Sequence, residues 1–315
     1  MQKIQLGRSG ITVPPVIFGC NIFGWTVDKA QSFRLLDTLV DSGLNALDTA
    51  DVYSYWVPGN KGGESEIIIG EWLKSRGRRH DVLIFSKAGM EMPGIGKGLS
   101  AQYLTSAIEA SLKRLQTEVI DLFQSHRDDE VTPHEETLEV YDKLIKAGKI
   151  RAIGASNYSV ARFKQALEVS VRTGLPRYET MQPHYNLLER AIEADLLPLC
   201  AGEGVGVIPY YALASGFLSG KYRSEADLGK SPRGARGAGK YLDAKGLKVL
   251  AALDAVADRY RTTAVQVAIA WFKGRPGLAA PIASATTIEQ LAELAQAAVL
   301  VLDAEAIAQL DAASA

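Results

Sequence analysis

Short apolar runs alternate with stretches of helical periodicity along most of this 315-residue chain. The runs span four to seven residues and are nearly all apolar, which is typical of parallel strands that are covered on both faces. We therefore expect eight strands, at residues 16–19, 45–48, 82–87, 120–126, 151–156, 179–183, 204–210 and 279–284.

The stretches between these runs repeat their apolar residues with the period of an amphipathic helix. Start and stop signals accompany several of them: Ser100 precedes one stretch, Thr132 and Pro133 precede another, and Gly148 ends it. We expect helices near residues 28–42, 64–76, 101–116, 134–147, 159–173, 188–202 and 263–274, and two further helices at 246–260 and 303–313.

Strands that alternate with helices, without a break in composition, predict an α/β fold, the (β/α)8 or TIM barrel. We expect residues 1–315 to form one such domain, with an N-terminal β-hairpin at residues 3–14 and extra C-terminal helices. A doubly wound sheet is the alternative, and it would place a GxGxxG turn after the first strand. Gly19 and Gly24 follow that strand without a glycine-rich helix entry, so the barrel is favoured.

The composition of the chain limits the classes of molecule that it is expected to bind. The 35 basic and 36 acidic residues nearly cancel, so no overall charge attracts nucleic acid or an acidic membrane. No apolar run approaches the roughly 20 residues of a membrane span. Residues 1–10 contain no long apolar stretch, so we do not expect a signal peptide. Two cysteines, Cys20 and Cys200, are too few for a disulfide framework. We expect a cytoplasmic protein that binds small molecules; its oligomeric state does not follow from the sequence.

Reactive side chains gather at the predicted carboxyl ends of three consecutive strands. Asp48 ends the second strand and Tyr53 lies just beyond it, Lys87 ends the third strand, and His126 ends the fourth. Each residue alone has an ordinary explanation, such as a helix cap or packing. In a (β/α)8 barrel, however, catalytic groups lie at the carboxyl ends of strands, so their convergence predicts an active site.

These four groups suit proton transfer to a carbonyl oxygen, or from an alcohol in the reverse direction. A tyrosine has a pKa of about 10; because a nearby ammonium stabilises the phenolate, we expect Lys87 to lower the pKa of Tyr53. Asp48 would keep Lys87 charged, and His126 would orient the substrate carbonyl or share the proton transfer. No side chain donates a hydride, so a reduction needs a cofactor.

Seven ordered segments resemble those of the aldo-keto reductases over residues 3 to about 300. They read LDTADVYS with GGESE, FSK, DLFQSH, GKIRAIGASNYS, MQPHYN, PYYALASGFLSGKY and QVAIAWF. That family is a (β/α)8 barrel that binds a nicotinamide cofactor, usually NADP(H), without a Rossmann turn. The resemblance implies an oxidoreductase that reduces aldehydes or ketones, or oxidises an alcohol or sugar hydroxyl. It also implies that Asp48, Tyr53, Lys87 and His126 form the catalytic tetrad, with Tyr53 as acid and base.

The resemblance also implies cofactor contacts. Ser156, Asn157 and Gln182 match the residues that hold the nicotinamide carboxamide, and Tyr210 matches the aromatic residue that stacks on the nicotinamide ring. The other implied contacts lie after the first strand, in the loop over the pyrophosphate and in the adenosine segment: Gly19, Cys20, Leu213, Ser215, Gly216, Leu218, Lys221, Ser284, Thr286, Gln290 and Glu293.

Two departures from the family pattern bear on the cofactor. Residues 210–213 read Tyr-Tyr-Ala-Leu where Tyr-Ser-Pro-Leu is frequent, which brings a second ring near the cofactor and removes a rigid proline. Residues 282–294 contain no Lys or Arg, although members that prefer the phosphorylated cofactor often have one there. NADP(H) is favoured because most members of the family use it, and NAD(H) is possible. Lys230, Arg233 or Arg236 would supply the positive charge that residues 282–294 lack.

Residues 213–243 form the longest stretch without a clear element. Such loops in compact domains are usually functional lids or disordered segments. Between Lys230 and Lys240 there are four positive charges and no acid. A solvated flexible loop and a clamp for a phosphate-bearing ligand both fit this composition.

Three other interpretations stay open from the residues alone. Lys87 at a strand end also suits a Schiff-base aldolase. His126, His184 and Asp48 would be the ligands of a metallohydrolase, but only four histidines and no HxH or HExxH pair occur, so no metal is expected. The third is a non-enzymatic nicotinamide-binding subunit that senses redox state for a partner.

Aromatic residues flank the tetrad and indicate where a substrate would bind. Trp25 follows the first strand, and Tyr55 and Trp56 follow Tyr53. Such walls suit aromatic aldehydes, apolar ketones or sugar faces alike, although the same rings also serve to pack a loop. The expected substrate is a small carbonyl compound or sugar.

Overall fold

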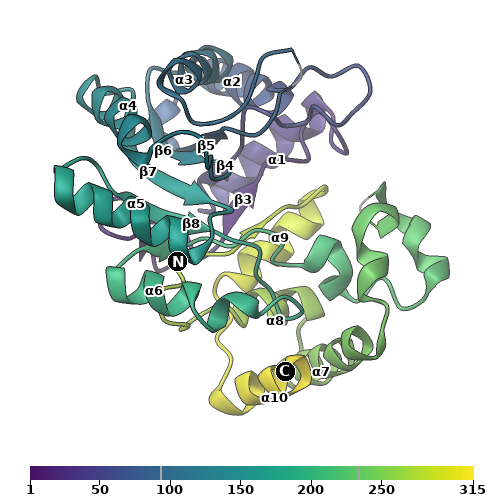
Figure 1. Ribbon diagram of the computed structural model, residues 1–315. Helices are drawn as coiled ribbons and strands as arrows, with labels where there is room; N and C mark the ends of the chain where they lie inside the picture. The colour runs from purple at the N-terminus through teal and green to yellow at the C-terminus, as the bar shows by residue number, and fades with distance from the viewer. Residues whose placement is uncertain (93, 233) are drawn as a thin grey trace.

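The computed structural model describes residues 1–92, 94–232 and 234–315, and within them eight parallel strands form one curled sheet surrounded by helices (Figure 1). The strands pair in the order β10-β3-β4-β5-β6-β7-β8-β9. Their bounds are β3 (Ile17–Gly19), β4 (Ala46–Asp48), β5 (Leu83–Ala88), β6 (Ile120–Ser125), β7 (Ile150–Ser156), β8 (Tyr178–Gln182), β9 (Gly206–Val207) and β10 (Ile282–Ala283).

The segment at residues 277–283 closes the sheet into a ring. On one side it pairs with β9, where Val207 N donates to Gly277 O and Ala279 N donates to Val207 O, both at 2.8 Å. On the other side Ile282 pairs with Ile17 of β3. Because this segment pairs with both β3 and β9, the sheet is closed and the predicted (β/α)8 barrel is confirmed.

Helices cover the outside of the ring (Figure 1), and α7 lies beside α10. Their bounds are α1 (Lys29–Asp41), α2 (Glu64–Arg76), α3 (Ala101–Leu115), α4 (His134–Lys146), α5 (Val160–Thr173), α6 (Leu196–Glu203), α7 (Ala244–Tyr260), α8 (Ala264–Ala270), α9 (Ile288–Ala297) and α10 (Ala304–Ser314). Across the described residues, every helix is too short or too polar to cross a bilayer.

The predicted N-terminal hairpin, β1 (Ile4–Gln5) and β2 (Thr12–Val13), closes one end of the barrel. Its side chains Leu6, Ile11 and Val13 are buried in one cluster with barrel residues that include Phe85 and Leu122. These barrel residues precede the carboxyl ends of their strands. The hairpin therefore occupies the amino end and leaves the carboxyl end for the site.

Two helical expectations need correction. The helix expected at residues 188–202 begins only at Leu196, where Asp195 accepts a hydrogen bond from Leu196 N and Pro198 lies in the first turn, a position that tolerates proline. Residues 288–297 form α9, which the sequence interpretation missed because it treated residues 282–294 only as a cofactor segment. Thr287, which caps α9 by accepting from Gln290 N, was the available signal.

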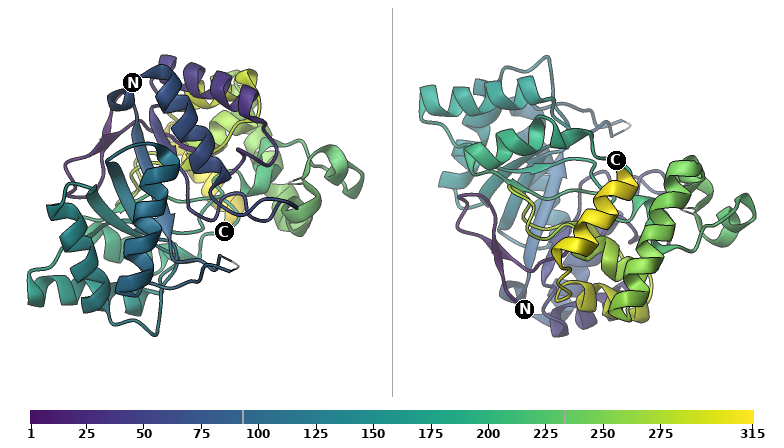
Figure 2. Two further views of the ribbon diagram at one scale, coloured as in Figure 1. Left: turned by 90° about the horizontal axis from the view of Figure 1, so that it is seen from above. Right: turned by 90° about the horizontal axis from the view of Figure 1, so that it is seen from below.

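The long segment at residues 213–243 is folded into short helical turns and projects beside α7 (Figure 2). The turns are Ala214–Ser219, Glu225–Lys230, Gly234–Ala238 and Gly239–Tyr241. Tyr222 anchors them: its ring is fully buried and its hydroxyl lies 2.6 Å from Ser231 Oγ. We call residues 222–241 the strap.

Helices α2 and α3 pack closely at Gly70. A Cβ at this position would lie 2.1 Å from Arg114 O and 2.7 Å from the carbonyl carbon of Leu115. Because backbone atoms cannot move aside cheaply, we expect Gly70→Ala to lower the free energy of unfolding by about 1–3 kcal/mol, measured by urea denaturation.

The matched control is Gly202→Ala in α6, where an added Cβ has no neighbour within 4 Å. Alanine favours a helix over glycine, so this variant should gain up to about 1 kcal/mol. Equal stabilities of the two variants would contradict the close contact between α2 and α3.

Candidate functional site

A cleft of about 790 Å³ opens where the strands end. The strand register explains this, because Gly19 pairs with Asp48 and Ser156 with Gln182, each at the last residue of its strand. The cleft is lined by these residues of the sequence interpretation: Gly19, Trp25, Asp48, Tyr53, Tyr55, Trp56, His126, Ser156, Asn157, Gln182, Tyr210, Leu213, Ser215, Gly216, Lys221, Ser284, Thr286, Gln290 and Glu293.

Three residues of that interpretation do not line the cleft. Lys87 is fully buried beneath it. Cys20 is also fully buried; its thiol donates to Phe18 O at 3.6 Å, and burial raises the pKa of that thiol. Leu218 is packed in the hydrophobic core. The side chains of Cys20 and Leu218 are therefore not available to a ligand in the cleft.

Lys87 and Asp48 form a buried ion pair. Lys87 Nζ donates to Asp48 Oδ2 at 2.7 Å and to Thr49 O at 2.7 Å, and the two side chains are 0% and 3% exposed. A buried ammonium without an anion is strongly unfavourable, so Asp48 and the Thr49 carbonyl hold the charge in place.

The other oxygen of Asp48 is also occupied. Gln182 Nε2 donates to Asp48 Oδ1 at 3.0 Å, and Gln124 Nε2 donates to the same oxygen at 3.3 Å. The sequence interpretation missed Gln124. A signal was present: it lies two residues before His126, so if the strand continued both side chains would point to the same face.

Tyr53 lies over this pair, with Lys87 Nζ 5.1 Å from the centre of its ring. Burial, followed by the negative charge of Asp48 and the nearby Tyr211, raises the pKa of Tyr53 well above its usual range. Burial dominates and the charge of Asp48 acts in the same direction, so the net shift of this pKa is upward although an ammonium lies beneath the ring. Tyr53 is protonated at neutral pH.

His126 stands beside Tyr53, with ring centres 5.9 Å apart and the rings at 75°. Burial, followed by the positive charges of Lys87 and Arg127, holds the pKa of His126 well below its usual range. Its Nδ1 is buried without a hydrogen-bond partner in the described part of the chain. His126 is therefore a neutral imidazole at the edge of the cleft.

Asn157 organises the opposite wall. It adopts a left-handed backbone with φ +56°, which asparagine tolerates better than most residues. Its amide donates to His126 O at 3.0 Å and to Ser156 Oγ at 3.1 Å, and its oxygen accepts from the Tyr210 hydroxyl at 2.9 Å. His184 stacks on the Tyr210 ring at 5.3 Å and 12°.

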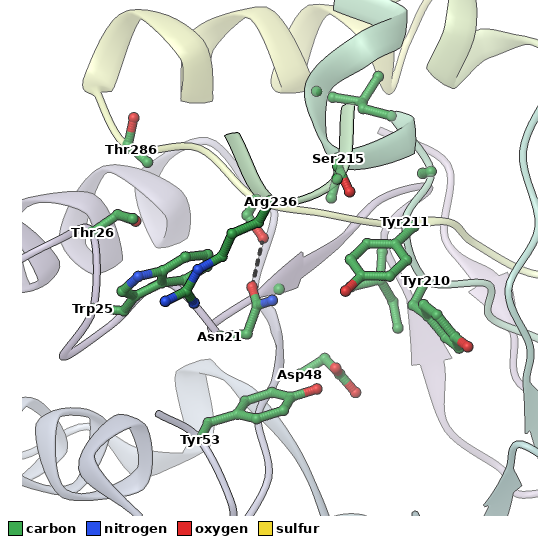
Figure 3. A pocket seen from close by; sticks show the side chains of 18 of the residues that line it. Asn21, Trp25, Thr26, Asp48, Tyr53, Tyr210, Tyr211, Ser215, Arg236 and Thr286 are labelled. Atoms are coloured by element: carbon green, nitrogen blue, oxygen red, sulfur yellow. Dashed lines mark hydrogen bonds between the residues drawn. The ribbon is translucent and has the colours of Figure 1, made fainter. Parts of the chain in front are cut away.

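The strap reaches over the cleft through Arg236, whose guanidinium lies 5.3 Å above the Trp25 ring (Figure 3). Two other strap cations are paired elsewhere: Lys230 with Asp227 at 2.7 Å and Lys240 with Glu189 at 2.9 Å. Neither Lys230 nor Lys240 lines the cleft, whereas Arg236 does. Arg233 lies outside the described residues.

The backbone at residues 214–216, which precedes the strap, has a conformation that lets a ligand approach its amides closely. Ala214, Ser215 and Gly216 have φ of +48°, +58° and +88°, and Ser215 and Gly216 line the cleft together with Lys221. Successive backbone amides in such conformations form concave surfaces that bind anions. This stretch is the one that the sequence interpretation assigned to a pyrophosphate.

Several further lining residues were not assigned from the sequence. They include Asn21, Thr26, Val52, Met90, Arg127 and Ser219. Asn21 and Thr26 follow β3, and Arg127 follows His126, so each was signalled by its place after a strand end. Tyr211, noted only as a second ring near the cofactor, also lines the cleft and has φ +55°.

The residues of the metallohydrolase interpretation do not gather at one place, because His184 is stacked behind Tyr210 and does not line the cleft. In residues 1–92, 94–232 and 234–315, no three His, Cys, Asp or Glu side chains are arranged to hold a metal ion.

The sequence model of the Aldo/keto reductase family matches residues 15–315. The chain belongs to the aldo/keto reductase family. This places the cleft in a family of carbonyl-reducing enzymes that generally use NAD(P)H.

Relatives of this aldo/keto reductase carry different names. It is 32% identical to the "uncharacterized oxidoreductase YrpG" of Bacillus subtilis over 99% of this chain and 95% of that protein. It is 29% identical to versiconal hemiacetal acetate reductase of Aspergillus parasiticus, covering 99% and 96%. It is 33% identical to a "probable voltage-gated potassium channel subunit beta" of Arabidopsis thaliana, covering 93% and 90%.

Beneath the Tyr53 loop this reductase buries a second carboxyl, that of Asp51. Both carboxyl oxygens lack a hydrogen-bond partner in the described residues. Burial, followed by the charge of Glu66 and opposed by Arg114, raises its pKa from 3.8 to about 8. Asp51 therefore adds an uncharged acid to the loop, in place of the loop-stabilising hydrogen bonds that a short aspartate usually makes.

Asp51 makes stability depend on pH. Because its folded pKa lies above the unfolded value, the folded chain binds more protons than the unfolded chain between about pH 4 and pH 8. We expect Asp51→Asn, which cannot ionise, to become progressively more stable than wild type as the pH rises through this window, measured by urea denaturation at each pH.

The control is Asp41→Asn, which removes an exposed carboxyl at the end of α1 and should not change this pH dependence. The assignment to Asp51 would be refuted if Asp51→Asn and wild type lost stability in parallel as the pH rose.

Proposed function

We propose that this aldo/keto reductase reduces an aldehyde or ketone with NAD(P)H, or oxidises the corresponding alcohol or sugar hydroxyl, with Tyr53 as the general acid and base. One observation carries the proposal. A protonated Tyr53 and a neutral His126 line the same cleft, directly above the buried Lys87–Asp48 pair.

The cleft has the donor set that a nicotinamide dinucleotide requires. Ser156, Asn157 and Gln182 would hold the carboxamide, Tyr210 would stack on the ring, and the backbone at residues 214–216 would meet the pyrophosphate. Its volume of about 790 Å³ lies in the range of cofactor sites. When bound there, the cofactor supplies the hydride that no side chain provides.

The protein itself supplies the proton for the reaction. Tyr53 is held in its acid form by burial, so its hydroxyl is ready to protonate a carbonyl oxygen as negative charge develops there. Lys87, 5.1 Å from the ring centre, then stabilises the phenolate that is left. Neutral His126 offers an imidazole for hydrogen bonding to the same oxygen, and Asp48 keeps Lys87 charged throughout.

The aldolase alternative is disfavoured by the position of Lys87. Its ammonium is fully buried and engaged by Asp48 and Thr49, so it is not presented to a carbonyl substrate. The non-enzymatic alternative keeps support from the relative that is named as a channel β-subunit. A cofactor-binding protein without turnover would be expected on that view.

Turnover is the direct test. NADPH and NADH oxidation, followed by absorbance across aldehydes, ketones and sugars, should reveal activity in wild type. We expect Tyr53→Phe to lower kcat by about 100- to 10,000-fold, the usual contribution of a general acid, while the affinity for the cofactor stays near that of wild type.

Tyr260→Phe is the matched control, because Tyr260 does not line the cleft and its hydroxyl accepts from Asp303 N at the end of α7, so its loss should leave kcat unchanged. Full activity of Tyr53→Phe would refute the proton-transfer role. Cofactor binding without turnover of any substrate would favour the non-enzymatic alternative.

We further propose that NADP(H) is preferred and that Arg236 recognises its additional phosphate. Thr286, Gln290 and Glu293 line that part of the cleft without offering a cation. Arg236 lies on the Trp25 and Thr286 side of the cleft in Figure 3, across from Tyr210. Among the described residues Arg236 forms no ion pair, whereas Lys230 and Lys240 are paired with Asp227 and Glu189. Its charge is therefore the strap charge that would meet a phosphate in the cleft.

Exchange of Arg236 tests this preference. We expect Arg236→Gln to raise KM for NADPH by roughly tenfold or more, the value of a charge-assisted hydrogen bond, and to leave KM for NADH nearly unchanged. Lys230→Gln, which removes a strap cation already paired with Asp227, should change neither. An equal rise of KM for NADPH and NADH would mean that Arg236 does not bind the additional phosphate of NADPH.

The substrate would enter between aromatic walls. Trp25 and Trp56 meet edge to face at 5.7 Å, and Trp56 meets the Tyr53 ring at 5.6 Å. This surface supports carbonyl compounds that bear an aromatic or other apolar face. The relative named versiconal hemiacetal acetate reductase justifies including bulky carbonyl compounds in the screen.

A further inference from the structure

Two glutamine side chains meet inside the barrel beneath the cleft. Gln124 on β6 is fully buried, and Gln182 at the end of β8 is 2% exposed and lines the cleft. Strand β7 runs between them, and it carries Gly154 beside Gln124. A Cβ on Gly154 would lie 3.1 Å from Gln124 Cγ and 2.1 Å from Thr180 Oγ1, so the absence of a side chain leaves the space that Gln124 occupies.

The chemistry of Asp48 fixes how both amides are turned. The carboxylate paired with Lys87 only accepts hydrogen bonds, and its Oδ1 faces both glutamines. Each must therefore direct its NH2 group toward Asp48, and the distances to Oδ1 are 3.3 Å for Gln124 and 3.0 Å for Gln182.

Gln124 then completes the arrangement at Gln182. With its own NH2 turned to Asp48, its Oε1 accepts from Gln182 Nε2 at 3.1 Å. Both N–H groups of Gln182 are thereby used, one by Asp48 and one by Gln124. The group that Gln182 has left to offer a ligand is its oxygen, an acceptor.

We propose that Gln124 is a positioning residue that, through Gln182, makes the cleft select a nicotinamide ring bearing an N–H donor on its carboxamide. The inference rests on the proposed function, in which Gln182 contacts that carboxamide. Without Gln124, Asp48 would still accept one N–H of Gln182, but the other N–H would lose its acceptor. A turn of the amide about the Asp48 hydrogen bond would then offer this second N–H to the cleft.

An equilibrium binding experiment tests this inference without requiring turnover. The probes are NADP⁺ and its 3-acetylpyridine analogue, in which an acetyl group keeps the carbonyl but has no N–H. We expect wild type to bind NADP⁺ roughly 10- to 100-fold more tightly than the analogue, the effect of a buried hydrogen bond left unmade. In Gln124→Met this ratio should fall by about tenfold, because the N–H of Gln182 that loses its acceptor can donate to the carbonyl that both probes carry.

A second variant gives a readout that a simple packing role would not produce. Gln124→Glu introduces a carboxyl that, when protonated, restores both the donor to Asp48 and the acceptor for Gln182. Burial and the charge of Asp48 would raise the pKa of this carboxyl. At low pH the ratio in Gln124→Glu should therefore equal that of wild type, whereas Gln124→Met, which offers no such acceptor, should have the lowered ratio at the same pH.

Ser125→Ala is the control. Ser125 is the next residue on β6, equally buried, and its hydroxyl lies 2.9 Å from those of Tyr141 and Tyr178, away from Asp48. Its variant should keep the wild-type ratio, so that loss of a buried hydrogen bond on β6 is separated from loss of Gln124.

The outcomes separate the inference from the proposed function. A wild type that binds both probes equally, or a folded Gln124→Met with an unchanged ratio, would overturn the inference alone. If Gln124→Met does not fold, Gln124→Glu decides, and a lowered ratio in this variant at low pH would overturn the inference, because its acceptor for Gln182 is restored. A wild type that binds neither probe, and neither NAD⁺ nor its 3-acetylpyridine analogue, would overturn the proposed function together with the inference.

Discussion

The buried ion pair between Lys87 and Asp48 is the interaction on which the site depends. Removing two charges from water costs several kcal/mol for each ion, and the cost is recovered only when every remaining donor and acceptor is satisfied. Here Thr49 O accepts a second hydrogen bond from Lys87, and Gln124 and Gln182 donate hydrogen bonds to the other oxygen of Asp48. Loss of any one of these partners would leave a buried polar group exposed to an apolar core.

This pair also sets the protonation states above it. The carboxylate adds to the burial that keeps Tyr53 protonated, and the ammonium adds to the burial that keeps His126 neutral. The two groups that line the cleft are therefore an acid and an uncharged imidazole. Such a set suits donation of a proton to a carbonyl oxygen better than activation of a nucleophile, which agrees with membership of the aldo/keto reductase family.

The barrel provides the place for this chemistry. The N-terminal hairpin fills the amino end with Leu6, Ile11 and Val13, and the strand carboxyl ends are left for the cleft. The strap then crosses this open end, held by its buried Tyr222 and by the Lys240–Glu189 pair, so that Arg236 reaches Trp25. The ring of strands and a surface segment held by these contacts thus enclose one site.

The sequence by itself determined the fold and the four central residues. Short apolar runs that alternate with helical stretches are compatible with few architectures. Because the carboxyl ends of barrel strands lie on one rim, the proximity of Asp48, Tyr53, Lys87 and His126 was predictable from their positions. The capped helix α9 and Gln124 were also detectable, through Thr287 and through the two-residue repeat of a strand, although neither was used.

Only the tertiary structure decided the energetics of the site. Whether Tyr53 gains or loses a proton depends on burial and on charges that lie far apart in the chain, so the direction of its pKa did not follow from the presence of Lys87. Which strap cation faces the cleft also depends on the folded chain, because Lys230 pairs with Asp227 and only Arg236 of the two lines the cleft. The amide pair of Gln124 and Gln182 arises only because β7 brings a glycine between them. Local sequence specifies elements and their ends, whereas desolvation and pairing arise from what the folded chain brings together.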